Sequence, residues 1–119
     1  MAVIIRPATH ADIEAFSSMD GKPSIRAVCM EKDGRIIALG GIAYAKGRWI
    51  GFCDLAAEAR HHKMHIMRAA RRFMADARQS GVRYIYAMAD PCEARSVAWL
   101  KSLGFRLDPR SGVLYRWGI

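Results

Sequence analysis

The stretch Trp49-Ile-Gly-Phe-Cys-Asp-Leu55 stands before a long helical pattern, Ala57 to Ser80, and the apolar run Arg83 to Met88 follows that pattern. The first and last of these segments have the length and apolar content of strands, whereas apolar residues recur every three to four positions in the middle segment. A strand, a helix of crossover length and a second strand in this order predict a parallel strand pair. Parallel pairing places helices on the faces of a sheet, so these segments decide the fold class.

The long helical pattern has one apolar side. Its stripe consists of Ile66, Ala70, Phe73 and Ala77, with Met67 and Met74 beside it. The arginines of this segment lie largely off the stripe. We therefore expect Phe73 to anchor the core and Arg72 to be exposed.

Three strands precede this helix in direct succession, over residues Ile25–Glu31, Arg35–Ala45 and Trp49–Leu55. Asp33-Gly34 and Lys46-Gly47 supply the turns between them. Strands joined this closely predict an antiparallel meander. Within the second strand, Gly40-Gly41 indicates a bulge or the close approach of another backbone.

The two ends of the chain add a strand and a helix in front and a helix and two strands behind. Val3–Arg6 reads as a strand, and Thr9 is a good helix N-cap with Asp12 three residues on. Behind the long helix, the expected elements are a helix over Glu93–Ser102 and strands over Phe105–Leu107 and Val113–Trp117. The order is β-α-β-β-β-α-β-α-β-β, for which we expect one α/β (α+β) domain over residues 1–119 with a mixed central sheet and helices on both faces.

Composition limits the classes of function. The chain has 119 residues, of which 52% are hydrophobic, so a packed core is expected. Lys plus Arg is 19 and Asp plus Glu is 11, which gives a net charge of +8 and favours anionic partners. No apolar run is long enough for a spanning helix, and the start has no signal-peptide pattern, so we expect no membrane association. Cys29, Cys53 and Cys92 have no paired-motif spacing, which indicates reduced thiols in a cytoplasm.

Four strings in this order resemble the GNAT superfamily of N-acetyltransferases, and together they cover nearly the whole chain. They are Val3-Ile-Ile-Arg-Pro-Ala-Thr-His-Ala-Asp12, Arg35-Ile-Ile-Ala-Leu-Gly-Gly-Ile42, Ala77-Arg-Gln-Ser-Gly-Val-Arg-Tyr-Ile85 and Ser96-Val-Ala-Trp-Leu-Lys-Ser-Leu-Gly-Phe105. The resemblance implies the GNAT fold, acetyl-coenzyme A as co-substrate and direct attack of an amine on its thioester. The acceptor, a protein or a small amine, and the oligomeric state stay open.

Two departures from the family pattern matter for the site. No glycine occurs between Gly51 and Gly81, where the family has its glycine-containing phosphate loop. The family's usual tyrosine, which protonates the leaving thiolate, falls at the position of Leu100. A basic helix start without glycines resembles small acetyltransferase-like proteins of bacteriophages, which would place the protein in the cytoplasm of a bacterial host.

The residues expected to bind coenzyme A come from two segments. By the resemblance, Cys53 and Leu55 end the strand that holds the pantetheine arm, and Asp54 is the candidate general base. The coenzyme's phosphates would lie at the cationic start of the long helix, where a helix N-terminus attracts anions. That segment consists of Arg60, His61, His62, Lys63, Met64, His65 and Ile66.

Alternatives stand beside each of these interpretations. The basic run could be a solvated surface, Asp54 could pair with a nearby arginine, and Cys53 could be a core residue. His61 and His65 have metal-ligand spacing on a helix, but no third ligand suggests itself, so we expect no metal site. Two other function classes are a catalytically inactive GNAT-fold phage protein, serving as a binding or virion component, and a nucleic-acid binder that uses the Arg-rich helix. The tryptophans and tyrosines could stack bases, although their strand positions favour core packing.

Overall fold

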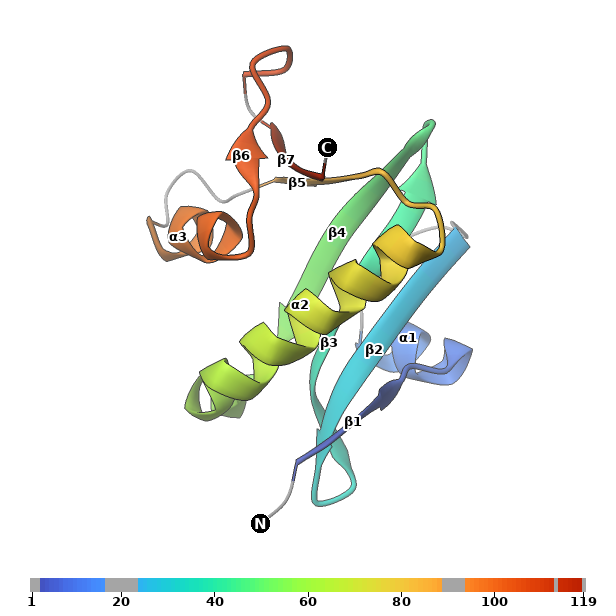
Figure 1. Ribbon diagram of the computed structural model, residues 1–119. Helices are drawn as coiled ribbons and strands as arrows, with labels where there is room; N and C mark the ends of the chain where they lie inside the picture. The colour runs from blue at the N-terminus through green and yellow to red at the C-terminus, as the bar shows by residue number, and fades with distance from the viewer. Residues whose placement is uncertain (1–2, 17–23, 89–93, 113, 119) are drawn as a thin grey trace.

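The computed structural model describes residues 3–16, 24–88, 94–112 and 114–118. Its strands are β1 (Ile4–Pro7), β2 (Ser24–Lys32), β3 (Arg35–Ala45), β4 (Arg48–Leu55), β5 (Tyr84–Met88), β6 (Arg106–Leu107) and β7 (Leu114–Gly118) (Figure 1). Its helices are α1 (His10–Phe16), the 3-10 helix η1 (Ala57–His62), α2 (Lys63–Gln79) and α3 (Ala94–Ser102). The predicted positions of Cys92, Glu93 and Val113 lie outside the described residues.

The strands form one sheet in the order β1-β2-β3-β4-β5-β7-β6. β2, β3 and β4 pair antiparallel in sequence, so the predicted meander is confirmed. β4 and β5 pair parallel through Ile50 and Tyr86, which confirms the predicted crossover. β7 then lies between β5 and β6 and pairs antiparallel with both, so the sheet is mixed.

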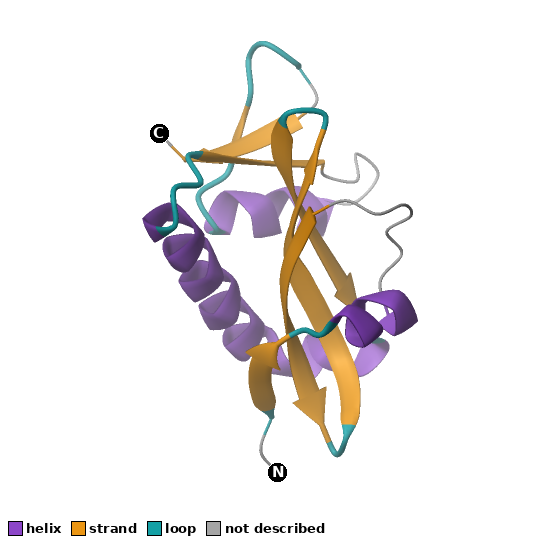
Figure 2. Ribbon diagram, turned by 90° about the vertical axis from the view of Figure 1, so that its right-hand side faces the viewer, coloured by secondary structure: helices purple, strands orange, loops and turns teal. Residues whose placement is uncertain are grey.

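Helices lie on both faces of this sheet, as the sequence predicts. Figure 2 shows α2 along one face and α1 on the other. Ile42 of β3 and Ile85 of β5 pack with Met74 of α2 and Leu100 of α3 in one buried cluster, which places α3 on the α2 side. The α/β (α+β) class expected from the sequence, a mixed central sheet with helices on both faces, is therefore the observed one.

The start of the long helix differs from the prediction. Residues 57–62 form a 3-10 helix, and the α-helix begins only at Lys63. His62 between them has φ −125° and ψ 32°, outside the helical region. Ala59 is completely buried against Met30, Ile37 and Ala38. Packing of this alanine into the core explains why the chain approaches the sheet before α2 starts.

The predicted apolar stripe of α2 is close to the observed one. Ile66 and Ala77 are buried, and so is Met74, which was expected beside the stripe. Phe73 is half-buried rather than a fully buried anchor, because it lines a cavity described below. Arg72 is exposed, as predicted.

The glycine pair of β3 marks a close backbone approach and not a bulge. The register irregularity lies elsewhere in β3: Met30 pairs with Ala38 and Glu31 pairs with Ile36, so Ile37 is the extra residue. A Cβ atom placed on Gly41 would collide with the Arg26 carbonyl oxygen and would lie 2.7 Å from Cα of Ala27, so no larger residue fits there. At Gly40 the nearest atom would be 3.4 Å away, which is an ordinary contact.

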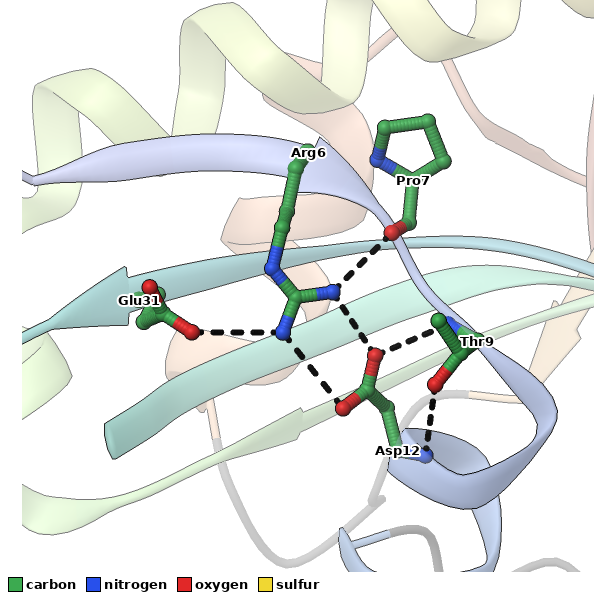
Figure 3. Close-up of polar contacts among 5 residues, drawn as sticks. All are labelled: Arg6, Pro7, Thr9, Asp12 and Glu31. Carbon is green, nitrogen blue, oxygen red and sulfur yellow. Dashed lines mark hydrogen bonds and ion pairs between the residues drawn. The ribbon is translucent and has the colours of Figure 1, made fainter. Parts of the chain in front are cut away.

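The predicted N-cap of α1 is present and carries an additional ion pair (Figure 3). The backbone N–H of Thr9 donates to the Asp12 carboxylate at 2.8 Å, and the backbone N–H of Asp12 donates to the Thr9 hydroxyl at 3.2 Å. This exchange is a capping box. Arg6 donates to Asp12 at 2.8 Å and to Glu31 of β2 at 3.2 Å. The Arg6 guanidinium and the Thr9 bonds hold the pKa of Asp12 well below its usual range.

Candidate functional site

The pairing of the parallel strands β4 and β5 is short in the described part of the chain. Among the described residues, Ile50 and Tyr86 are the pair that joins the two strands. β4 continues beyond this pair to Leu55 while staying paired with β3 on its other side. Over residues 52–55, its side toward β5 therefore has no strand partner among the described residues.

A cavity of about 270 Å³ lies at this divergence. Gly51 and Cys53 of β4 and Ile85 and Ala87 of β5 contribute to its wall. Further wall residues come from α2 and α3 and include Ile66, Ala70, Phe73, Trp99 and Leu100. Because the wall is almost entirely apolar, the cavity suits an uncharged, flexible ligand segment.

The ionisable side chains in the cavity wall are the thiols of Cys29 and Cys53, as far as the described residues go. Cys53 is exposed in part, and desolvation of its thiol at the cavity wall raises the pKa to about 11, an effect to which the charge of Asp54 adds. Burial also raises the pKa of Cys29. Both thiols are therefore protonated at neutral pH and are poor nucleophiles.

Asp54, the candidate general base, is half-buried on β4 opposite Leu39 of β3. It does not line the cavity. Side chains alternate along a strand, so Asp54 lies on the face opposite to Gly51 and Cys53. Leu55 at the end of the strand is 54% exposed. The structure thus brings Cys53 to the cavity and leaves Asp54 and Leu55 beside it.

The cationic segment before and within the first turn of α2 is exposed at the end of the cavity. Arg60, His61, Lys63 and His65 are exposed, and so is Met64 at 71%. Ile66 is buried and lines the cavity, which connects the segment to the apolar wall. The first turn of α2 has no acidic residue, and no side chain caps its N-terminus. This helix start is therefore electrostatically suited to an anion.

His62 differs from its neighbours in this segment. It is half-buried, its Nε2 atom is enclosed without a hydrogen-bond partner, and its ring packs edge-on to that of His65, with centroids 6.0 Å apart. A bound anion would therefore contact the exposed cations and not His62 Nε2. No group of three or more potential metal ligands occurs among the described residues.

Leu100, at the position where the resemblance places a catalytic tyrosine, is buried in α3 and lines the cavity. The position is thus at the site, but its side chain has no proton to donate. The cavity residues Cys29, Phe73 and Trp99 were not expected from the sequence. Their only sequence signal is apolar character at strand or helix spacing, which equally describes core residues.

Comparison with solved structures identifies the fold. An acetyltransferase from Agrobacterium tumefaciens has a TM-score of 0.69 and 15% identity, with 98% of this chain and 91% of that chain covered. An IAA acetyltransferase from Bacillus cereus has a TM-score of 0.66 and 10% identity, with 97% of both chains covered. A Desulfovibrio desulfuricans protein assigned to the GNAT family of acetyltransferases has a TM-score of 0.65 and 14% identity, with 98% of this chain and 99% of that chain covered.

The chain therefore has the fold of the GNAT acetyltransferases along nearly its whole length. No family model and no curated protein sequence matches it. A separate finding concerns membranes: no helix among the described residues is long and apolar enough to span one.

Proposed function

We propose that this GNAT-fold chain binds acetyl-coenzyme A between β4 and β5 and transfers the acetyl group to an amine. The observation that carries the proposal is the divergence of the two strands beyond Ile50 and Tyr86 over an apolar cavity. We also propose the cytoplasm as its compartment, because the cysteine pattern fits a reducing environment.

The apolar wall fits the uncharged part of the coenzyme. Gly51 and Cys53 of β4 line the cavity, and beyond Ile50 the β5 side of this strand has no sheet partner among the described residues. Backbone N–H and C=O groups without a sheet partner are the natural hydrogen-bonding sites for the amide groups of a pantetheine arm. In this proposal the pantetheine arm lies along β4 and forms hydrogen bonds with it, as an additional strand of the sheet would.

The phosphate end depends on side chains, because the loop has no glycine. Arg60 and Lys63 are exposed beside the N-terminus of α2, with His61 and His65 next to them. Charge-assisted hydrogen bonds are roughly twice as strong as neutral ones, so these side chains compensate in part for a missing backbone cradle. We expect binding that weakens markedly with salt, because exposed charges are screened.

The transfer itself needs little from the cavity wall. The acceptor nitrogen attacks the thioester carbonyl carbon, a C–N bond forms, and the C–S bond breaks as the thiolate of coenzyme A leaves. Backbone N–H groups of β4 stabilise the oxyanion. Asp54 or a water molecule takes the proton from the amine, and water protonates the thiolate, since Leu100 cannot.

A second candidate function is binding without catalysis, as in an inactive GNAT-fold phage protein. It is favoured by the wall of the cavity, where the described residues include no general acid or base besides two protonated thiols. The two candidates differ in turnover, and the second, which keeps the fold as a binding or virion component, does not require the coenzyme.

Isothermal titration calorimetry with acetyl-coenzyme A, at low and high salt, tests the binding site. Replacing Arg60 and Lys63 together by Ala should weaken binding about tenfold or more, since each charge-assisted bond contributes about 1.5–3 kcal/mol. The matched control is Arg68→Ala with Arg72→Ala, which removes the same charge from exposed positions further along α2. The control should bind within about twofold of the wild type.

Three outcomes separate the alternatives. No heat at millimolar coenzyme would discard acetyl transfer and favour the inactive protein that keeps the fold as a binding or virion component. Equal weakening in both double variants would move the phosphates away from the start of α2. Binding without release of free thiol, when a panel of amines is supplied, would favour the non-catalytic candidate.

A further inference from the structure

The sheet face opposite α2 and α3 carries an arrangement of arginines and tyrosines that the proposed acetyl transfer does not use. Arg106 of β6 pairs with Arg116 of β7, Arg116 pairs with Tyr86 of β5, and Tyr86 pairs with Ile50 of β4. Directly paired residues share a face, and so do residues two positions along a strand. Arg48 and Tyr84 therefore join them. We call Arg48, Ile50, Tyr84, Tyr86, Arg106 and Arg116 the Arg–Tyr face.

The Arg–Tyr face lies on the opposite side of the sheet from α2 and α3. Ile85 of β5 and Trp117 of β7, which alternate with its members, pack in the cluster formed with α2 and α3. α1 is on the same side as the Arg–Tyr face but packs against β3 (Figure 2). Arg48, Ile50 and Arg106 are exposed, while Tyr84, Tyr86 and Arg116 are half-buried.

Two arginine–tyrosine stacks organise the face. The Arg48 guanidinium carbon lies 4.8 Å from the centre of the Tyr86 ring, and that of Arg116 lies 4.8 Å from the centre of the Tyr84 ring. Two further arginine stacks, Arg26 on Trp49 and Arg78 on Trp117, lie on the α2 side of the sheet, whereas the two stacks of the Arg–Tyr face use tyrosines. Each stack places an arginine guanidinium group on a tyrosine ring, and not beside a carboxylate.

The positive charge of the face is not neutralised by the described part of the chain. The ion pairs found there involve Arg6, His10 and Arg35, and none involves Arg48, Arg106 or Arg116. On this face of β4, the carboxylate is Asp54, four residues beyond Ile50 and therefore about 13 Å along the strand. The face therefore presents three arginine side chains and two tyrosine rings, and its positive charge favours an anionic ligand.

We infer that the Arg–Tyr face binds single-stranded nucleic acid. Phosphates would pair with the guanidinium groups, and unpaired bases would stack on the tyrosine rings or on guanidinium planes, as on other sheet surfaces that bind single strands. From β4 to β6 there are three strand steps of about 4.8 Å, roughly 14 Å, which accommodates about four stacked nucleotides. An acidic protein surface would use the charges but not the rings.

Fluorescence anisotropy with labelled oligo(dT) and oligo(U) of about 12 nucleotides tests this inference. Replacing Arg48 and Arg106 together by Gln should weaken binding about tenfold or more and lower its salt dependence. Both arginines are exposed and form no ion pair with the described residues. The charge-matched control, Arg68→Gln with Arg72→Gln on α2, should bind within about twofold of the wild type. Tyr86→Leu should weaken binding at least about fivefold without changing the salt dependence. A thermal melt of each variant tests whether it is folded. If Tyr86→Leu does not fold, the double variant of Arg48 and Arg106 decides the test.

The inference would be overturned by absence of binding at low salt, by equal loss in the two arginine double variants, or by displacement of the oligonucleotide by polyglutamate as readily as by unlabelled oligonucleotide. The last result would identify an acidic protein as the partner. A duplex of the same length should bind more weakly, because its bases are not free to stack; tighter duplex binding would also contradict the inference.

Discussion

Ile50 of β4 lies opposite Tyr86 of β5, and this parallel pair is where the two strands separate. The neighbours Gly51 and Ile85 are directed to the cavity between the sheet and α2, while Ile50 and Tyr86 belong to the opposite face. One junction thus borders both the proposed coenzyme site and the proposed nucleic-acid surface. Because side chains alternate, substitutions can address the two faces separately.

Gly41→Ala should destabilise the protein by about 2 kcal/mol or more, because its Cβ would collide with the β2 backbone at Arg26 and Ala27. Gly40→Ala is the matched control, since its Cβ would make only ordinary contacts, and it should change stability by less than about 1 kcal/mol. Urea denaturation of both variants measures the difference. Similar costs for the two would contradict the close approach of β2 at Gly41.

Met74→Ala should cost about 2–5 kcal/mol, because this side chain is buried between α2 and the sheet. Arg72→Ala, two positions away on the exposed side of α2, should cost less than about 0.5 kcal/mol. Chemical denaturation of both compares them. An Arg72 variant as unstable as the Met74 variant would mean that the assigned face of α2 is wrong.

Local patterns predicted the elements well, because each depends on neighbours in sequence. The meander, the crossover and the capping box of Thr9 and Asp12 all follow from periodicity, turns and caps. The sequence did not predict that the register between β2 and β3 shifts at Met30 and Glu31, because the shift depends on how the two strands pair. The 3-10 start before α2 likewise depends on the packing of Ala59 against a distant strand.

Asp12→Asn should lower the melting temperature at pH 7, and the difference from the wild type should narrow as the pH falls below about 4. The Arg6 guanidinium lowers the pKa of Asp12 in the folded state. A lowered folded pKa stabilises the protein above the unfolded pKa, and this contribution is lost as the pH falls toward the folded value. Melts of the wild type and the variant between pH 7 and pH 2.5 measure the trend.

The Arg6→Gln background supplies the control for this pH dependence. Arg6 is the first cause of the lowered pKa, so most of the pH-dependent difference should be absent in that background. A difference that persists unchanged, or one that widens toward low pH, would show that the ion pair in Figure 3 does not stabilise the folded state.

Cys53 should react with iodoacetamide at least about tenfold more slowly than free cysteine at pH 7.5. A pKa of about 11 leaves roughly one thiol in three thousand as thiolate at that pH. The rate should rise steadily toward pH 10, and acetyl-coenzyme A should slow it, since Cys53 lines the cavity. Peptide mass spectrometry after timed alkylation resolves Cys53 from the other thiols. A rate equal to that of free cysteine would contradict the raised pKa of this thiol.

The candidate site was predictable only in part. The exposed cations Arg60 and Lys63 follow from a basic run at a helix start, and Leu100 at the cavity follows from the family resemblance. The position of Asp54 beside the cavity rather than in its wall depends on strand alternation relative to a helix far along the chain. The stack of the Arg116 guanidinium on the Tyr84 ring joins residues 32 positions apart, and no local pattern predicts such a stack.

The melting temperature with and without acetyl-coenzyme A tests the central claim most directly. At a ligand concentration about ten times the dissociation constant, binding to the folded state stabilises it by about 1.4 kcal/mol, which corresponds to about 5 °C for a chain of this size. The account predicts this increase for wild type at about 1 mM acetyl-coenzyme A and a clearly smaller one for Arg60→Ala with Lys63→Ala. An unchanged melting temperature at millimolar acetyl-coenzyme A would contradict it.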